Sequence, residues 1–178
     1  MSLHRHPLYI FAKPPPEPLA SIVALDRRDS ARAPELLHNT LLALGDLALA
    51  PAGHLPALIE AVTTFDGLAF PLAYDRIVEG ERVTKLAGNR TAGAPVRTFQ
   101  HRFAAHLARR GIAAARRPAP HVTLAYRRDG RGDALLPRPI GWRVEEILLV
   151  ESIVGEGRHV VHARCRLDRR SRPPLMDA

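Results

Sequence analysis

The sequence predicts an α+β fold that is built from a duplicated unit. In each half of the chain, a helical pattern is followed by a short break and then by an apolar strand. The two helix–strand pairs span residues 17–29 with 36–44 and residues 95–110 with 119–127. Both strands carry the pattern His-x-Thr-Leu. In a random chain of this composition, the expected number of occurrences of this pattern is only roughly 0.05. The two copies begin at His38 and His121, 83 residues apart, and indicate an internal repeat.

Length and composition fit one folded domain over residues 1–178. Hydrophobic residues make up 46% of the chain and charged residues 25%, values that exclude wholesale disorder. Cys165 is the only cysteine, which excludes an internal disulfide and is typical of a reducing compartment. No apolar run is long enough to cross a membrane. We therefore expect a cytoplasmic protein without a membrane partner, and a monomer.

The other elements follow from apolar periodicity and from Gly and Pro breaks. The long helix is the clearest, because Val96, Phe99, Phe103 and Leu107 recur at three or four residues and Gly111 follows as a cap. A loop rich in Gly, Arg and Pro is expected over 129–139, and a frayed tail over 168–178. The remaining elements are a helix at 55–64 and strands at 8–12, 68–75, 82–86, 144–153 and 159–167, the last two forming a hairpin.

The repeated motif has a chemical meaning. Side chains two apart on a strand share a face, so His38 lies beside Thr40, and His121 beside Thr123. If the two halves fold about a twofold-like axis, the two His–Thr pairs face each other. Histidine, with a pKa near 6.5, can accept or donate a proton near neutral pH, and phosphodiester cleavage requires one group of each kind. The threonine hydroxyls can bind phosphate oxygens, so we expect neither a metal nor a cofactor.

The motifs, together with the stretch 117–125 around the second one, resemble the 2H phosphoesterases. The resemblance is strongest to the RNA 2′,3′-cyclic phosphodiesterases, also called 2′-5′ RNA ligases. It implies a bilobed fold of two antiparallel sheets flanking a central groove, with helices on the outside and halves near 1–88 and 89–178. It also implies hydrolysis of a 2′,3′-cyclic phosphate to a 2′-phosphate, with 2′-5′ ligation as the reverse. By this analogy His38 is the general acid and His121 activates water, although nothing in the sequence excludes the opposite order.

Two positions depart from the family pattern. Tyr126 stands where the family often has an arginine after the second motif, and Arg127 comes next. Arg127 shares the strand face of His121 and Thr123 if the strand is regular, so it is a candidate phosphate clamp. The first motif also lacks the frequent Arg-Pro lead-in, because residues 35–37 read Glu-Leu-Leu. Both departures bear on the identity of the substrate rather than on the two histidines.

The expected partners are RNA ends or cyclic nucleotides. The formal net charge of +8, carried mostly by arginines, permits a phosphate-rich partner but also fits a compositional bias of the chain. Phe70, Tyr74 and Trp142 are candidates for stacking on a base. Two other functions remain open. One is an RNA-binding module without turnover, and the other is a cyclic phosphodiesterase for a small metabolite such as a cyclic phosphate of ADP-ribose.

Overall fold

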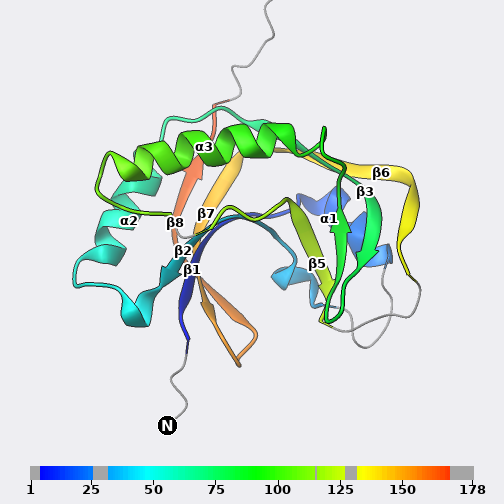
Figure 1. Cartoon of the computed structure of the whole chain (residues 1–178), viewed down its shortest axis with the longest axis horizontal. Coiled ribbons are helices and arrows are strands. Elements are labelled where there is room, and N and C mark those ends of the chain that lie inside the picture. The colour runs from blue at the N-terminus through cyan, green and yellow to red at the C-terminus, as the bar shows by residue number, and fades with distance from the viewer. Residues whose placement is uncertain (1–4, 26–31, 115, 127–131, 169–178) are drawn as a thin grey trace, which may run out of the picture.

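The computed structural model describes residues 5–25, 32–114, 116–126 and 132–168. Within these residues the chain forms an α+β fold of eight strands and three α-helices (Figure 1). The strands are β1 (Pro7–Ala12), β2 (Asn39–Asp46), β3 (Phe70–Glu79), β4 (Thr84–Ala87), β5 (His121–Ala125), β6 (Ala134–Val144), β7 (Glu146–Ile153) and β8 (Arg158–Arg166). The helices are α1 (Pro16–Leu25), α2 (His54–Thr63) and α3 (Ala94–Ala108).

The strands form one antiparallel sheet, not the two sheets that the family resemblance implies. Its order is β6-β3-β4-β5-β2-β1-β7-β8. The two central strands β2 and β5 share one backbone pair, Asn39 with Val122, whereas their outer neighbours form longer ladders. The expected sheets are therefore two four-stranded halves of a single sheet, joined at the two motif strands. Each half-sheet contains strands from both sides of residue 88.

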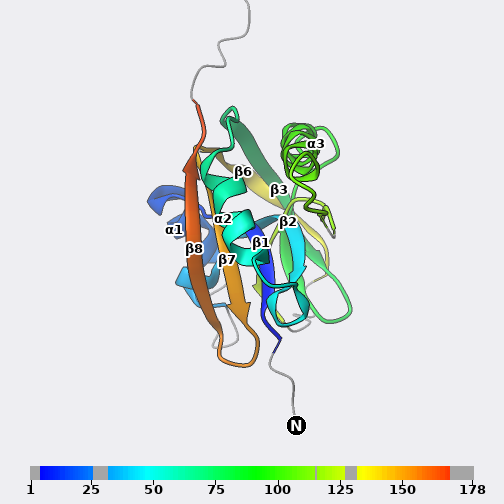
Figure 2. The same ribbon diagram turned by 90° about the vertical axis from the view of Figure 1, so that its left-hand side faces the viewer.

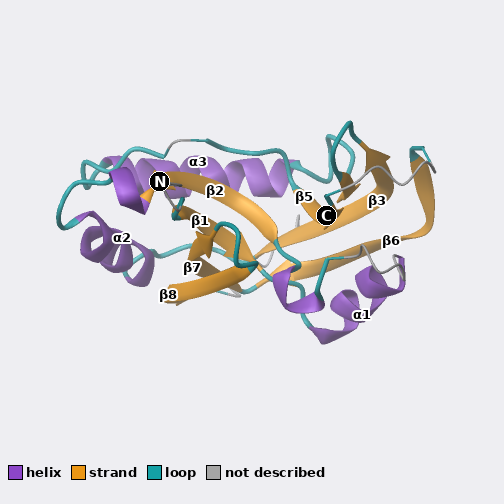
Figure 3. Ribbon diagram, turned by 90° about the horizontal axis from the view of Figure 1, so that it is seen from below, coloured by secondary structure: helices purple, strands orange, loops and turns teal. Residues whose placement is uncertain are grey.

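The repeat is visible in the order of the elements. In the first copy, β1 is followed by α1 and β2, and β1 pairs with β2. In the second copy, β4 is followed by α3 and β5, and β4 pairs with β5. Each motif strand is thus the second strand of a strand–helix–strand unit. The helices α1 and α3 of the two units lie on opposite sides of the strands (Figures 2 and 3).

Helix α3 has the expected form. Val96, Phe99, Phe103 and Leu107 are all buried, and the side chains of Phe99 and Phe103 contact Phe65 in the core. The helix ends because Gly111 adopts a positive φ of 70°, which lets the N–H groups of residues 111 and 112 bond back to the last turn. Helix α3 packs on β2 and β3, α2 on β7 and β8, and α1 on β6.

One strand was not expected. The sequence predicts a loop over 129–139, yet Ala134–Val144 form β6 in spite of Pro137 and Pro139. The strand is at the end of the sheet order and has β3 as its partner. Prolines are tolerated in such an edge strand, because a missing N–H on the outer side removes no ladder bond.

The first motif strand begins later than predicted. Residues 34–36 form a 3-10 turn, so the strand predicted over 36–44 is β2, from Asn39 to Asp46. Helix α1 ends at Leu25, and the rest of the predicted helix lies outside the described residues. In the predicted tail, Asp168 bridges to Leu68, and residues 169–178 lie outside the described part. Among the described residues, no helix has the length and apolarity that a membrane crossing requires.

Candidate active site

The junction between β2 and β5 brings the two motifs together. Asn39 and Val122 pair directly, and both side chains are fully buried on the same face of the sheet. Their chain neighbours point to the other face, because successive side chains of a strand alternate. That face carries His38, Thr40, His121 and Thr123, which are all half-buried, and we call it the motif face.

The two histidines are held in the same way. Nδ1 of His38 lies 2.6 Å from the carbonyl oxygen of Leu36, and Nδ1 of His121 lies 2.8 Å from that of Ala119. A carbonyl oxygen only accepts, so each Nδ1 carries the proton and donates it. Each neutral ring therefore keeps its lone pair on Nε2, and each Nε2 can exchange a proton with a ligand. The identical contact in both copies is the structural counterpart of the sequence repeat.

The surroundings of His38 keep it neutral. Its ring stacks on Phe11 at a centroid distance of 3.6 Å and meets the ring of His159 edge-on at 5.1 Å. Burial, which the hydrogen bond to Leu36 partly opposes, and the nearby charge of Arg32 together lower the pKa of His38 to about 3. In the free protein, the His38 ring is thus neutral at neutral pH.

Both threonines stand on the motif face beside a residue of the neighbouring strand. Thr40 pairs with Phe11 of β1, and Thr123 pairs with Lys85 of β4. Each threonine hydroxyl has a proton that it can donate to a ligand. Lys85 shares the face of Thr123 by register, which places a positive side chain beside the second motif. The sequence alone does not single out Lys85, because it predicts a strand at 82–86 but not which strands lie beside it in the sheet.

Asn39 connects the two motifs from behind. Its Oδ1 accepts hydrogen bonds from the backbone N–H of His121 and from the hydroxyl of Tyr74, each at 2.8 Å. Asn39 lies between His38 and Thr40 in the chain, so the first motif holds the backbone of the second. Tyr74 is fully buried in this contact and cannot stack on a base. The other two stacking candidates, Phe70 and Trp142, are also buried in the core.

Two basic residues hold the segment that leads into His38. The Arg32 Nε donates to the carbonyl oxygen of Leu36 at 3.0 Å, the same oxygen that accepts from His38. The Lys13 Nζ donates to the preceding carbonyl, that of Glu35, at 2.5 Å. Burial and the positive charges of Arg32 and Lys13 together lower the pKa of His159 to about 4. Neither basic residue had a signal in the sequence, because the contacts cross from one element to another.

Other polar residues lie elsewhere in the fold or outside the described residues. Arg127, the candidate phosphate clamp, falls outside them. His6 and His162 flank the carboxylate of Glu151 at 2.5 and 2.7 Å, where the two imidazoles hold the pKa of the carboxyl below its usual range although burial opposes this. In the described ranges, no group of three or more His, Cys, Asp or Glu side chains is arranged to hold a metal.

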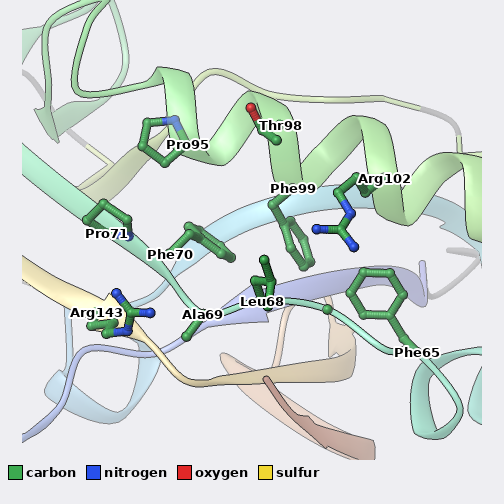
Figure 4. A pocket seen from close by; sticks show the side chains of 11 residues that line it. Phe65, Leu68, Ala69, Phe70, Pro71, Pro95, Thr98, Phe99, Arg102 and Arg143 are labelled. Carbon is green, nitrogen blue, oxygen red and sulfur yellow. The ribbon is translucent and has the colours of Figure 1, made fainter. Parts of the chain in front are cut away.

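A separate hollow lies between α3 and the start of β3 (Figure 4). It has a volume of about 220 Å³ and apolar walls, with Arg102 and Arg143 at its sides. Its lining contains none of the motif residues. The hollow is lined by Phe65, Gly67, Leu68, Ala69, Phe70, Pro71, Pro95, Thr98, Phe99, Arg102 and Arg143. The site that carries the paired histidines is therefore distinct from this pocket.

The fold and the paired motifs define a class: an α+β protein in which two strand–helix–strand units present their His–Thr pairs on one sheet face. No family model and no curated protein matches the sequence. Solved structures do match it. The apo structure of E. coli LigT aligns with a TM-score of 0.69 and 23% identity, over 94% of this chain and 100% of that one.

Two further structures agree with this alignment. A protein described as a phosphoesterase gives a TM-score of 0.67 at 24% identity, over 93% of this chain and 99% of that one. The protein TT0787 of Thermus thermophilus gives 0.66 at 20% identity, over 89% and 96%. The chain therefore has the fold of LigT along nearly its whole length. The resemblance that the motifs predicted is confirmed at the level of the fold.

Proposed function

We propose that this chain is a metal-independent phosphodiesterase of the 2H type, which opens 2′,3′-cyclic phosphates of RNA or of nucleotides to leave a 2′-phosphate. The observation that carries the proposal is the duplicated histidine contact. Nδ1 of His38 and of His121 each donate to the carbonyl oxygen two residues earlier, and both rings lie on the motif face beside the only backbone pair between β2 and β5 in the described residues. Two such imidazoles can serve one phosphorus atom as acid and base.

The names of the structural neighbours support the proposal. One neighbour is described as a phosphoesterase, and LigT has been crystallised with 3′-AMP, NADP+, phosphate and ATP. Each of these ligands carries a phosphate group. A fold that receives phosphate groups in LigT is a suitable frame for the same chemistry here.

The proposed role of His38 follows from its neutral state, and His121 takes the remaining role. With a pKa of about 3, His38 is neutral in the free protein and suits the base that takes a proton from water. His121 acts in its imidazolium form and donates the proton on Nε2 to the leaving 3′ oxygen. This order is the reverse of the one that the family resemblance implies. The new P–O bond to water forms as the bond to O3′ breaks, so the proton that His38 gains balances the one that His121 loses.

The other groups on the motif face bind the phosphate. The hydroxyls of Thr40 and Thr123 donate to its non-bridging oxygens, and each hydrogen bond to a charged group contributes about 1.5–3 kcal/mol. Lys85 beside Thr123 adds a positive charge. With a 5′-hydroxyl in place of water, the same groups join two RNA ends through a 2′-5′ linkage.

The test is the turnover of nucleoside 2′,3′-cyclic phosphates and of a short RNA with a cyclic end. His38→Ala and His121→Ala are each expected to lower the rate by about 10²–10⁴, the usual contribution of a general acid or base. His101→Ala, on the exposed side of α3, is the matched control and should stay within twofold of wild type. A loss below tenfold in both motif variants overturns the proposal.

The same assay separates the alternatives. Tight binding of the cyclic RNA end without hydrolysis by the wild-type protein favours an RNA-binding module. Faster hydrolysis of a cyclic phosphate of ADP-ribose than of every RNA and nucleotide substrate favours a metabolite-specific enzyme. The proposed function requires instead that the RNA end or the cyclic nucleotide is the better substrate.

A further inference from the structure

Tyr126 is an exposed aromatic residue next to the second motif. Eight of the nine Phe, Tyr and Trp side chains are buried or half-buried, whereas Tyr126 is 68% exposed. It directly follows β5, three residues after Thr123. A large exposed ring beside a proposed phosphate site is a surface on which a flat ligand can stack.

Arg32 holds this ring in place. Its guanidinium carbon lies 5.1 Å from the centre of the Tyr126 ring, over one face. The arginine is itself fixed at two points, because its backbone N–H donates to the carbonyl oxygen of Leu124 at 2.8 Å and its Nε donates to that of Leu36. Since the Leu36 oxygen also accepts from His38, the tyrosine, the arginine and both motifs form one connected structure.

The first motif has aromatic neighbours of its own. Tyr9 lies on β1 and stacks on Phe11, the residue beneath His38. The pKa of the Tyr9 hydroxyl is raised first by burial and next by the charge of Tyr126. Tyr126 is linked to the first motif by geometry, through Arg32 and the Leu36 carbonyl oxygen that also accepts from His38.

We propose that Tyr126, backed by Arg32, is the platform on which the base of the substrate nucleotide stacks while its cyclic phosphate lies between the two histidines. The inference rests on the proposed function and deepens it, because it makes a nucleobase part of the recognised substrate. The guanidinium covers one face of the ring by a cation–π contact and leaves the other for the base. An aromatic platform accepts every base, so recognition by Tyr126 is independent of RNA sequence.

The experiment compares two substrates that differ only in the base: adenosine 2′,3′-cyclic phosphate and the 2′,3′-cyclic phosphate of methyl riboside. For Tyr126→Ala, KM for the adenosine compound should rise about 5- to 150-fold, which corresponds to a stacking energy of about 1–3 kcal/mol. KM for the base-free compound should change by less than twofold. Tyr126→Phe, which keeps the ring, should restore the difference between the two substrates.

Arg32→Ala tests the support of the platform, and Leu135→Ala is the control. Arg32→Ala should raise KM for the adenosine compound more than KM for the base-free one. Leu135 is 75% exposed and apolar but lies on the edge strand β6, so its removal should affect neither substrate. Equal changes in KM for both substrates with Tyr126→Ala, or no change for either, overturn the platform.

A binding measurement tests the stacking platform independently of the proposed function, because it requires no turnover. If the wild-type protein hydrolyses neither compound, calorimetric titration with adenosine 2′-monophosphate and with ribose 2-phosphate still compares a ligand that has a base with one that lacks it. A loss of at least fivefold in affinity for the adenosine ligand alone, in Tyr126→Ala, supports the platform although turnover is absent. An unchanged affinity for both ligands contradicts it, whatever the outcome of the assays on His38 and His121.

Discussion

Removal of the buried amide of Asn39 should weaken the fold by a calculable amount. In Asn39→Leu, the N–H of His121 and the hydroxyl of Tyr74 both lose their acceptor in a place that water does not reach. A buried donor left without a partner costs about 1–3 kcal/mol, so with two such donors the free energy of unfolding should fall by about 2–6 kcal/mol. Urea denaturation followed by circular dichroism measures the change, provided that the m-value stays constant.

Tyr74→Phe makes the prediction sharper. The single change removes one donor together with its hydroxyl and leaves the bond between Asn39 and the His121 N–H in place. We expect it to cost about 0.5–1.5 kcal/mol. In the double variant the tyrosine donor is no longer orphaned, so the loss should be smaller than the sum of the two single losses. Additive losses, or a change below about 1 kcal/mol for Asn39→Leu, would refute the claim that this amide joins the motifs.

Three further predictions concern protons and metals. The free energy of unfolding should fall as the pH drops from 6.5 toward 3, because the unfolded chain protonates His38 near 6.5 and the folded chain only at about 3. In His38→Asn, the loss of free energy of unfolding between pH 6.5 and 3 should be smaller than in wild type by at most about 5 kcal/mol. If the free energy of unfolding depends on pH identically in the variant and wild type, His38 is not a buried, neutral ring. The profile of kcat/KM on a cyclic nucleotide should show no acidic limb between pH 7 and 5 if His38 is the base, whereas a limb near 6.5 would contradict that role. An excess of EDTA should leave the rate within twofold, and a larger loss would point to a bound metal.

The parts of the fold that sequence reasoning predicted are those with a strong local pattern. Helix α3 repeats its apolar residues every three or four positions, and all four of them are buried. Strands β7 and β8 form the expected hairpin across Gly155 and Gly157. The two histidine motifs were visible because they are repeated, and they do lie on neighbouring strands of one sheet.

The parts that were missed depend on contacts between distant segments. Strand β6 contains two prolines, which locally favour a loop, and only its place at the edge of the sheet allows them. His159 reaches His38 because β8, β7 and β1 are neighbours, an order that no local pattern encodes. Asn39 had one weak signal, a polar residue at the buried position between a histidine and a threonine. The two half-sheets are joined at the same residue, because the backbone of Asn39 in β2 pairs with that of Val122 in β5.

The central claim is that His38 and His121 serve one phosphate between them. Its most direct measurement is an NMR titration of the ¹⁵N-labelled imidazoles with adenosine 2′-monophosphate, which requires no turnover. We predict that the Nε2 signals of both residues shift together, with one common Kd and a stoichiometry of one ligand per chain. A shift confined to one of the two rings, or two different Kd values, would contradict the account.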